Sequence, residues 1–215
     1  MHRLILLLAI LALAVGTTVA QAASSISGRV VNAEGQGVPQ AVVFLNDPGS
    51  ATAASGASAE MDQINKTFVP GVLPVVVGTR VHFPNRDQIH HHVYSFSRTK
   101  TFELPLYKGE DAPPVLFDKV GVVKVGCNIH DWMSGIILVL PNAHYAVTDA
   151  EGRFTLSGVP GGSHALAAWH AQHRGKLDDT TQRVELGDGL LEVNFTLPLD
   201  AASGRPAVSG ARKEP

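Results

Sequence analysis

The sequence is nearly free of cysteine, since Cys127 is the only one among 215 residues. A disulfide bond within the chain is therefore excluded. A lone thiol in an oxidising compartment is a liability unless it is buried, paired with another chain or bound to a metal. Cys127 needs one of these three explanations.

Charge is also scarce. Asp, Glu, Lys and Arg make up 17% of the residues, and the formal net charge is −2. This composition indicates neither a nucleic-acid-binding surface nor a polyanionic one, so no nucleic-acid partner is expected. The chain is richer in histidine, with 10 residues, and their distribution matters more than their number.

Long apolar runs are absent beyond the N-terminus. The run Leu4–Val15 follows Met-His-Arg and precedes small residues that end on Ala20-Gln21-Ala22. It is shorter than the roughly 20 residues of a membrane-spanning helix, and its flanks are typical of a secretory signal peptide. We expect residues 1–22 to be a signal peptide cleaved after Ala22 or Ala23. The mature protein is then periplasmic or secreted, with no membrane span.

The remaining apolar runs are short, rich in Val, Ile, Phe and Thr, and bounded by Gly, Pro, Asn or Asp. This pattern is typical of strands joined by turns, and no amphipathic helix stands out. The sequence predicts an all-β chain of sandwiches or barrels. The expected strands are Ile26–Val31, Ala41–Leu45, Leu73–Val77, Arg80–Phe83, His91–Ser97, Val122–Gly126, Gly135–Leu140, Phe154–Ser157, His164–Trp169 and Leu191–Leu197.

Two separated segments look like halves of one module. The motifs Ser27–Val31 and Gly37–Val43 normally lead directly into a Thr-Asp-x-x-Gly-x-Phe turn, which here comes about a hundred residues later, at Thr148–Phe154. Together these motifs resemble the carboxypeptidase regulatory-like domain. The resemblance implies a prealbumin-like β-sandwich built from residues 24–50 and 143–199.

The residues between the two halves, 58–141, read as a separate inserted β-domain. The Ala/Ser/Gly-rich stretch Gly49–Ala59 is a plausible flexible entry to it. The tail, residues 200–215, carries Gly, Pro, Ser and charges without a strand pattern, and we expect it to be disordered.

The insert carries a cluster of metal-binding side chains. Cys127, His130 and Met133 follow one another at intervals of three residues, in a loop that leaves the expected strand Val122–Gly126. A thiolate and two imidazoles in a plane, with a weak thioether above it, form the ligand set of a blue-copper site. A second histidine from another strand is needed to complete that set.

The stretch Phe83–Val93 supplies candidates for the second histidine. With the Cys127 loop, it resembles the cupredoxins, and the loop spacing is most like that of amicyanin. The resemblance implies a Greek-key β-sandwich or barrel that binds one copper ion, cycling between Cu(I) and Cu(II), through His91, Cys127, His130 and Met133. Since side chains alternate along a strand, His90 and His92 are expected to face away.

The motif Met61-Asp62-Gln63, with the histidine stretch and Cys-Asn-Ile-His-Asp, resembles bacterial proteins labelled methylamine utilisation proteins. That label implies electron transfer between a redox donor and acceptor, such as a cytochrome or a dehydrogenase. The chain departs from well-studied blue-copper proteins at three places. Gly126 precedes the cysteine, Asn128-Ile129 replaces a proline-containing pair, and His92 stands where asparagine is usual.

No general acid/base pair stands out, and four protein ligands close a metal to substrate, so we expect an electron carrier and not an enzyme. We expect His130 near the surface within an apolar patch of Ile129, Trp132 and Met133. Asp131 could orient a ligand or be merely solvated. Three alternatives remain open: a periplasmic copper carrier or buffer with His90–His92 as its entry site, a non-redox binding scaffold, and a structural zinc site.

Overall fold

The structure is a computed structural model that describes residues 24–173 and 175–199. The expected signal peptide and the expected disordered tail lie outside these residues. The described residues are all-β apart from one short 3-10 helix, η1 (Leu177–Thr180). None of them forms a helix long and apolar enough to cross a membrane.

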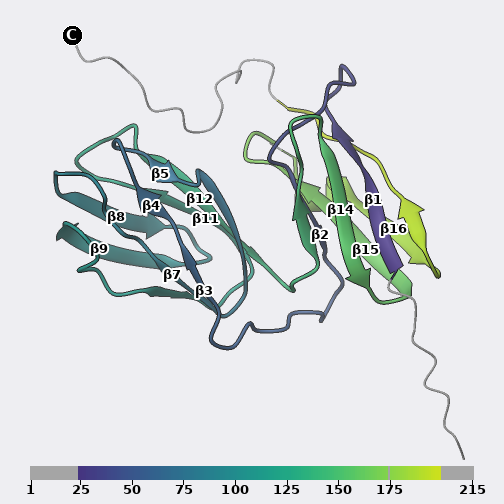
Figure 1. Cartoon of the computed structure of the whole chain (residues 1–215), viewed down its shortest axis with the longest axis horizontal. Coiled ribbons are helices and arrows are strands. Elements are labelled where there is room, and N and C mark those ends of the chain that lie inside the picture. Colours follow the sequence, from purple (N-terminus) through teal and green to yellow (C-terminus); the bar gives the residue numbers. More distant parts are fainter. Residues whose placement is uncertain (1–23, 174, 200–215) are drawn as a thin grey trace, which may run out of the picture.

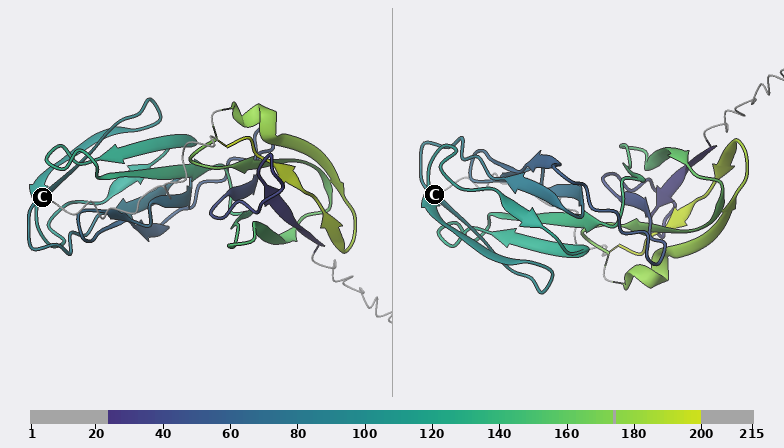
Figure 2. Two further views of the ribbon diagram at one scale, coloured as in Figure 1. Left: turned by 90° about the horizontal axis from the view of Figure 1, so that it is seen from above. Right: turned by 90° about the horizontal axis from the view of Figure 1, so that it is seen from below.

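The strands form two lobes that lie end to end (Figures 1 and 2). One lobe, here called the terminal sandwich, combines both ends of the described chain. Its sheets have the strand orders β14-β1-β17, with β18 also paired to β1, and β13-β2-β15-β16. Its strands are β1 (Ser24–Val31), β2 (Val42–Leu45), β13 (Tyr145–Val147), β14 (Arg153–Val159), β15 (Gly162–Trp169), β16 (Thr181–Leu186), β17 (Leu190–Glu192) and β18 (Phe195–Thr196).

The other lobe, the central sandwich, contains only strands from the middle of the chain. Its sheets are β6-β12-β11-β8-β9, β10-β7-β3 and the pair β4-β5. Its strands are β3 (Ser58–Glu60), β4 (Asp62–Gln63), β5 (Phe68–Val69), β6 (Val72–Val76), β7 (Thr79–His82), β8 (His91–Phe96), β9 (Thr101–Tyr107), β10 (Val115–Phe117), β11 (Gly121–Gly126) and β12 (Ser134–Leu140).

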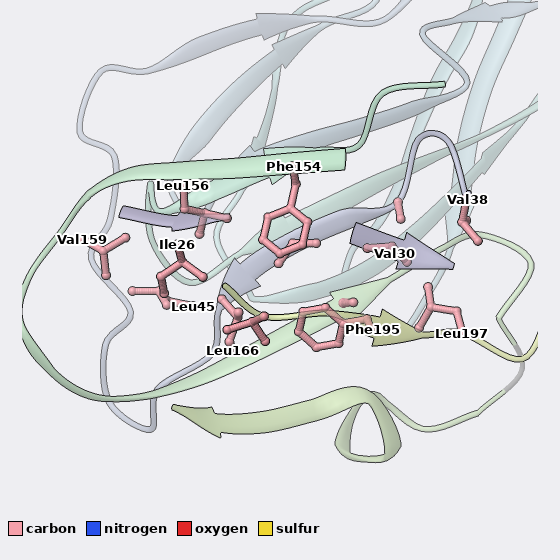
Figure 3. Packing of buried hydrophobic residues seen from close by; sticks show 14 of the residues in the cluster. Ile26, Val30, Val38, Leu45, Phe154, Leu156, Val159, Leu166, Phe195 and Leu197 are labelled. Atoms are coloured by element: carbon pink, nitrogen blue, oxygen red, sulfur yellow. The ribbon is translucent and has the colours of Figure 1, made fainter. Parts of the chain in front are cut away.

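The two halves of the terminal sandwich share one apolar core (Figure 3). Ile26 and Val30 from the first half pack with Phe154 and Leu166 from the second. The predicted Thr-Asp turn joins the halves, because the Thr148 hydroxyl donates to Val38 O (2.7 Å) and accepts from Ala41 N (2.8 Å). Segments about a hundred residues apart in the sequence therefore fold as one unit.

The single strand expected at Leu191–Leu197 is wrong, because β17 and β18 are two short strands that both pair with β1. The chain passes so close to β1 between them that a Cβ added to Gly28 would lie 1.8 Å from Val193 O. There the Asn194 side-chain oxygen accepts a hydrogen bond from Arg29 N (2.8 Å), in place of a backbone carbonyl. This contact interrupts the strand.

A third apolar cluster joins the two sandwiches. Side chains alternate along β12, so Ile137 and Val139 enter the core of the central sandwich, while Leu138 and Leu140 point to the outer face of its sheet. There they pack with Phe44 of the terminal sandwich, and with Val42 and Ala167. The terminal sandwich thus covers one end of this outer face.

Candidate metal centre

Two chain segments, the loop between β11 and β12 and the start of β8, meet at the end of the central sandwich remote from this interface. Cys127 directly follows β11, His130 and Met133 lie in the short loop before β12, and His91 is the first residue of β8. Strands β8 and β11 pair side by side, with Gly126 opposite Tyr94. The pairing places the start of one strand next to the end of the other, which brings His91 to the Cys127 loop.

His91, Cys127 and His130 form the only cluster of potential metal ligands of this kind within residues 24–173 and 175–199, with ligand atoms within 4.8 Å of one another. The Cys127 Sγ atom lies 3.9 Å from His91 Nδ1 and 3.7 Å from His130 Nδ1. Metal–nitrogen and metal–sulfur bonds of about 2.0 and 2.3 Å, meeting at a trigonal angle, separate their ligand atoms by about 3.7 Å. The three side chains are therefore spaced to share one metal ion.

The donor set also fits copper. Thiolate and imidazole ligands in a trigonal arrangement, with a thioether nearby, suit copper in both oxidation states. Cys127 is a free cysteine and is 2% exposed. His91 is 0% exposed, so this imidazole is held in the protein interior beside the sulfur.

The backbone of Met133 forms hydrogen bonds that close the loop between Cys127 and Met133. Its backbone N–H donates to His130 O (2.8 Å), and its carbonyl accepts from Cys127 N (3.2 Å). Its side chain is 2% exposed, so the expectation that it forms part of the surface patch is wrong. Trp132 and Ile129 are exposed as expected, at 57% and 48%, and the Trp132 ring packs edge-on against His130 at a centroid distance of 5.5 Å.

The neighbouring histidines lie apart from this cluster. His90 is exposed, and His92 Nε2 lies 2.8 Å from Glu103 Oε1 on the adjacent strand β9. Strand alternation therefore separates His91 from His90 and His92 in the way that the sequence predicts. Asp131 is exposed, which favours the solvated interpretation of its side chain.

Asp87 binds the His91 ring on the side that faces away from Cys127. Its carboxylate accepts a hydrogen bond from His91 Nε2 (2.8 Å), so that the opposite nitrogen, Nδ1, faces Cys127. A carboxylate in this position fixes the tautomer and the ring orientation of a metal-binding histidine. The sequence alone does not assign this role to Asp87, and the one signal for it is the position of Asp87 four residues before His91.

The turn that holds Asp87 is unusual. Asn65 and Lys66 both have left-handed backbone angles, with φ of 53° and 57°, and both backbone N–H groups donate to the Asp87 carboxylate (2.6 and 2.8 Å). Successive N–H groups arranged in this way form a concave anion-binding site. Burial of Asp87 opposes its ionisation, but these bonds and that from His91 outweigh it and hold its pKa below 3.8.

A buried polar group anchors the loop that precedes His91. The Gln63 amide donates to Phe83 O (3.1 Å) and to the Tyr107 hydroxyl (2.6 Å), and that hydroxyl donates in turn to Phe83 O. Burial raises the pKa of Tyr107 to about 12, so its hydroxyl stays protonated and available as a donor. The Asn85 amide donates to Ile89 O and Tyr107 O, both at 2.9 Å. The loop is thereby fixed at both ends.

The motif Met61-Asp62-Gln63 supports the same loop, which precedes His91. Met61 is fully buried in the core of the central sandwich, Asp62 pairs with Arg86 (3.0 Å), and Gln63 supports the loop. The structure thus gives each of the three residues a role in packing or in anchoring the segment that carries His91.

No family model matches the sequence, and no curated protein matches it. Solved structures do match. A copper-containing nitrite reductase from Thermus scotoductus SA-01 is 27% identical, with a TM-score of 0.38, over 45% of this chain and 27% of its own. A reduced mutant of amicyanin is 24% identical, with a TM-score of 0.36, over 46% of this chain and 98% of its own. A purple cupredoxin from Nitrosopumilus maritimus is 24% identical, with a TM-score of 0.31, over 46% and 97%.

These matches cover less than half of the chain, and this chain spans about a quarter of the nitrite reductase. Likenesses at TM-scores of this size support no statement about activity, which has to rest on the residues of the site itself.

Proposed function

We propose that this chain is a periplasmic type 1 copper protein that binds one copper ion and carries single electrons between two redox partners. His91, Cys127 and His130 would hold the copper ion, with the Met133 thioether as a fourth ligand. The spacing of the Cys127 sulfur from the two Nδ1 atoms, 3.9 and 3.7 Å, carries this proposal. A bound copper ion supplies the one-electron couple between Cu(II) and Cu(I).

The chain's own contribution is to hold the ligands still. His91 is fixed by Asp87, and the Cys127 loop is closed by the backbone bonds of Met133. Such a site rearranges little when an electron arrives, so the barrier to electron transfer stays small. Burial excludes water from the sulfur and protects the thiol from stepwise oxidation.

His130 offers a route for electrons. Unlike His91 it is partly exposed, and it lies between the sulfur of Cys127 and the exposed ring of Trp132. Ile129 and Trp132 add apolar surface beside it, which suits brief contact with a partner. A cytochrome or a dehydrogenase would meet this requirement.

A redox titration in the presence of a chelator tests the proposal. An electron carrier keeps its copper through repeated cycles of reduction and reoxidation, because buried ligands exchange slowly, and its visible absorption returns in full each time. The control is the variant His90→Ala, which alters an exposed neighbour of the ligands. Loss of copper to a weak Cu(I) chelator on the first reduction would contradict electron transfer and indicate a copper carrier.

A further inference from the structure

A groove of about 390 Å³ follows the outer face of the five-stranded sheet and reaches the metal centre from the side opposite to the core. Its walls come from β8, β11 and the loop before β12. The residues that carry the argument are Tyr94, Phe96, Lys124, Gly126 and Cys127.

The Tyr94 ring lies over Gly126 at the inner end of this groove. The two residues are opposite each other in neighbouring strands, and a Cβ added to Gly126 would lie 3.2 Å from both Cζ and the hydroxyl oxygen of Tyr94. Glycine within a strand often marks such a close approach. The ring therefore lies beside the residue that directly precedes Cys127.

A second aromatic ring continues outward from Tyr94. Phe96 is two residues further along β8, on the same face of the sheet, and its ring centroid is 5.1 Å from that of Tyr94. The Phe96 side chain is 81% exposed, although it is one of the large apolar residues of the chain. The two rings form a continuous aromatic path from the neighbourhood of Cys127 to the protein surface.

Positive charge surrounds the outer end of the groove. Lys124 lies beside Phe96, since its backbone N–H donates to Ser97 Oγ (2.9 Å), and Arg98 follows in the same turn. Both side chains are exposed, and neither forms an ion pair within the part of the chain that the structure describes. The nearby Lys100 is neutralised by Asp118 at 3.0 Å. Lys124 and Arg98 thus place two positive charges at the outer end of the groove, which Asp131 also lines, in a chain whose net charge is −2.

We propose that this groove docks an acidic redox protein, which exchanges an electron with the metal centre through Phe96 and Tyr94. The inference rests on the proposed electron-carrier function and adds a second port, distinct from the face that carries Trp132. In the forward step one electron passes from a reduced partner to Cu(II), giving Cu(I) and the oxidised partner, and no bond forms or breaks. Complementary charge steers such a partner to the surface, and the exposed ring supplies apolar contact.

The neighbouring surface supports this choice. The terminal sandwich already covers the outer face of the same sheet at Leu138 and Leu140. The groove is lined by Gly126 and Cys127, and a partner docked there would extend an existing interface.

The test uses an oxidised flavodoxin, an acidic redox protein, as the probe. Its affinity for the copper-free full-length protein is measured by calorimetry, so this readout does not depend on copper. We expect Arg98→Glu with Lys124→Glu to weaken binding by about tenfold or more at low salt, and Phe96→Ser to weaken it as well. Lys108→Glu reverses one positive charge outside the groove and serves as the control for net charge, and Trp132→Ser alters the other exposed ring.

The second readout is the rate at which flavodoxin hydroquinone reduces the copper-loaded protein. We expect Phe96→Ser and Tyr94→Leu to slow the reaction, while Trp132→Ser leaves it near the wild-type rate. Equal affinity for the wild type and the doubly charge-reversed protein would overturn the docking proposal. A rate lowered by Trp132→Ser and unchanged by Phe96→Ser would overturn the aromatic port. A failure of the copper assignment appears separately, as a wild-type protein without the visible absorption of a copper thiolate.

Discussion

Asp87 orients His91 through a hydrogen bond to its ring and is not itself one of the clustered ligand residues. Replacing a hydrogen-bonding partner behind a metal ligand typically lowers metal affinity by about 10- to 100-fold. We expect Asp87→Asn to lower copper affinity within this range, because an amide holds the imidazole less firmly and accepts more weakly from the backbone of Asn65 and Lys66. Competition with a chelator of known affinity measures the change.

Asp131→Asn is the matched control, since Asp131 adjoins His130 in sequence but is exposed. The control should keep the wild-type affinity. Equal affinities for all three proteins would mean that the bond from Asp87 does not position His91.

Met133 either binds the metal through its thioether or only packs in the core, and a substitution distinguishes the two roles. Leucine fills nearly the same volume as methionine, so Met133→Leu should cost less than about 1.5 kcal/mol in stability. It removes the thioether, however, and the axial ligand tunes the potential of a copper–thiolate site. We therefore expect the reduction potential and the visible band to shift while copper is retained.

Met61→Leu makes the same change at a fully buried position in the core of the central sandwich. It should leave both properties unchanged. Identical potentials for the wild type and Met133→Leu would make Met133 a packing residue.

Residue type and spacing were enough to identify Cys127, His130 and Met133 as one loop, because a loop of seven residues folds locally. His91 followed from the resemblance to the cupredoxins, and alternation along an expected strand set it apart from His90 and His92. The contacts made by Asp87 and Gln63 were not accessible in the same way. Each depends on residues about 20 positions away in the chain, which only the folded structure brings together.

At the scale of elements, Gly28 is the position where β1 has no room for a side chain. An added Cβ would lie 1.8 Å from the backbone oxygen of Val193, so β1 and the segment joining β17 to β18 would have to separate. We expect Gly28→Ala to lower the free energy of unfolding by about 1–3 kcal/mol. Urea denaturation measures the loss.

Gly187→Ala is the control, because a Cβ at Gly187 would meet nothing within 4 Å. A loss at Gly28→Ala no larger than at Gly187→Ala would contradict the close approach.

An ion pair ties β15 to the segment after β2. His164 donates from Nδ1 to Asp47 and from Nε2 to Pro160 O, both at 2.8 Å. Burial opposes the charge on each partner, but these bonds and the bond from Ala165 N outweigh it. The pKa of His164 is therefore raised above 6.5, and that of Asp47 is lowered below 3.8.

The stabilisation from His164 is complete below its unfolded pKa and is lost as the pH rises through the raised folded value. The stabilisation from Asp47 is complete above its unfolded pKa and is lost as the pH falls through the lowered folded value. The pair thus stabilises most between about pH 4 and pH 6.5. Asp47→Asn should reduce the difference between the free energies of unfolding at pH 5 and at pH 9, as measured by urea denaturation. A stability difference unaffected by this substitution would contradict the pair's contribution.

Most of the expected strands agree with the structure, because buried strands such as β11 and β12 have clear runs of Val, Ile and Leu. The missed strands lie at sheet edges. Strand β9 contains Pro105 and ends its sheet, where a missing backbone N–H is tolerated. Strand β16 also ends its sheet, and most of its residues are polar. The hydrophobic pattern of the sequence therefore identifies strands with a buried face, but it is a weak signal for strands at the edges of sheets.

At the scale of the whole molecule, the cluster between the sandwiches links the metal centre to the rest of the protein. Strand β12 begins next to the Met133 loop and ends in this cluster, where Leu140 is fully buried. We expect Leu140→Ala to lower the free energy of unfolding by about 2–5 kcal/mol, because it removes buried methyl groups and leaves a cavity. Denaturant unfolding of the copper-free protein measures this loss.

The control is Val120→Ala, at a residue that is 40% exposed. A loss below about 0.5 kcal/mol in Leu140→Ala, comparable with a surface substitution, would mean that the sandwiches do not stabilise each other through this cluster. The terminal sandwich itself follows from motifs in two distant segments, whereas the packing of Leu138 and Leu140 against it needed the three-dimensional arrangement.

The central claim is that Cys127 binds copper as a thiolate, and one spectroscopic comparison tests it most directly. Cu(II) is added to the mature protein, to Cys127→Ser and to His90→Ala, and optical and paramagnetic-resonance spectra are recorded for each. We predict an intense visible thiolate-to-copper band in the wild type and in His90→Ala, and its loss in Cys127→Ser. Copper that binds equally well to the wild type and to Cys127→Ser, without a band in either, would contradict the electron-transfer function and favour a non-redox binding scaffold.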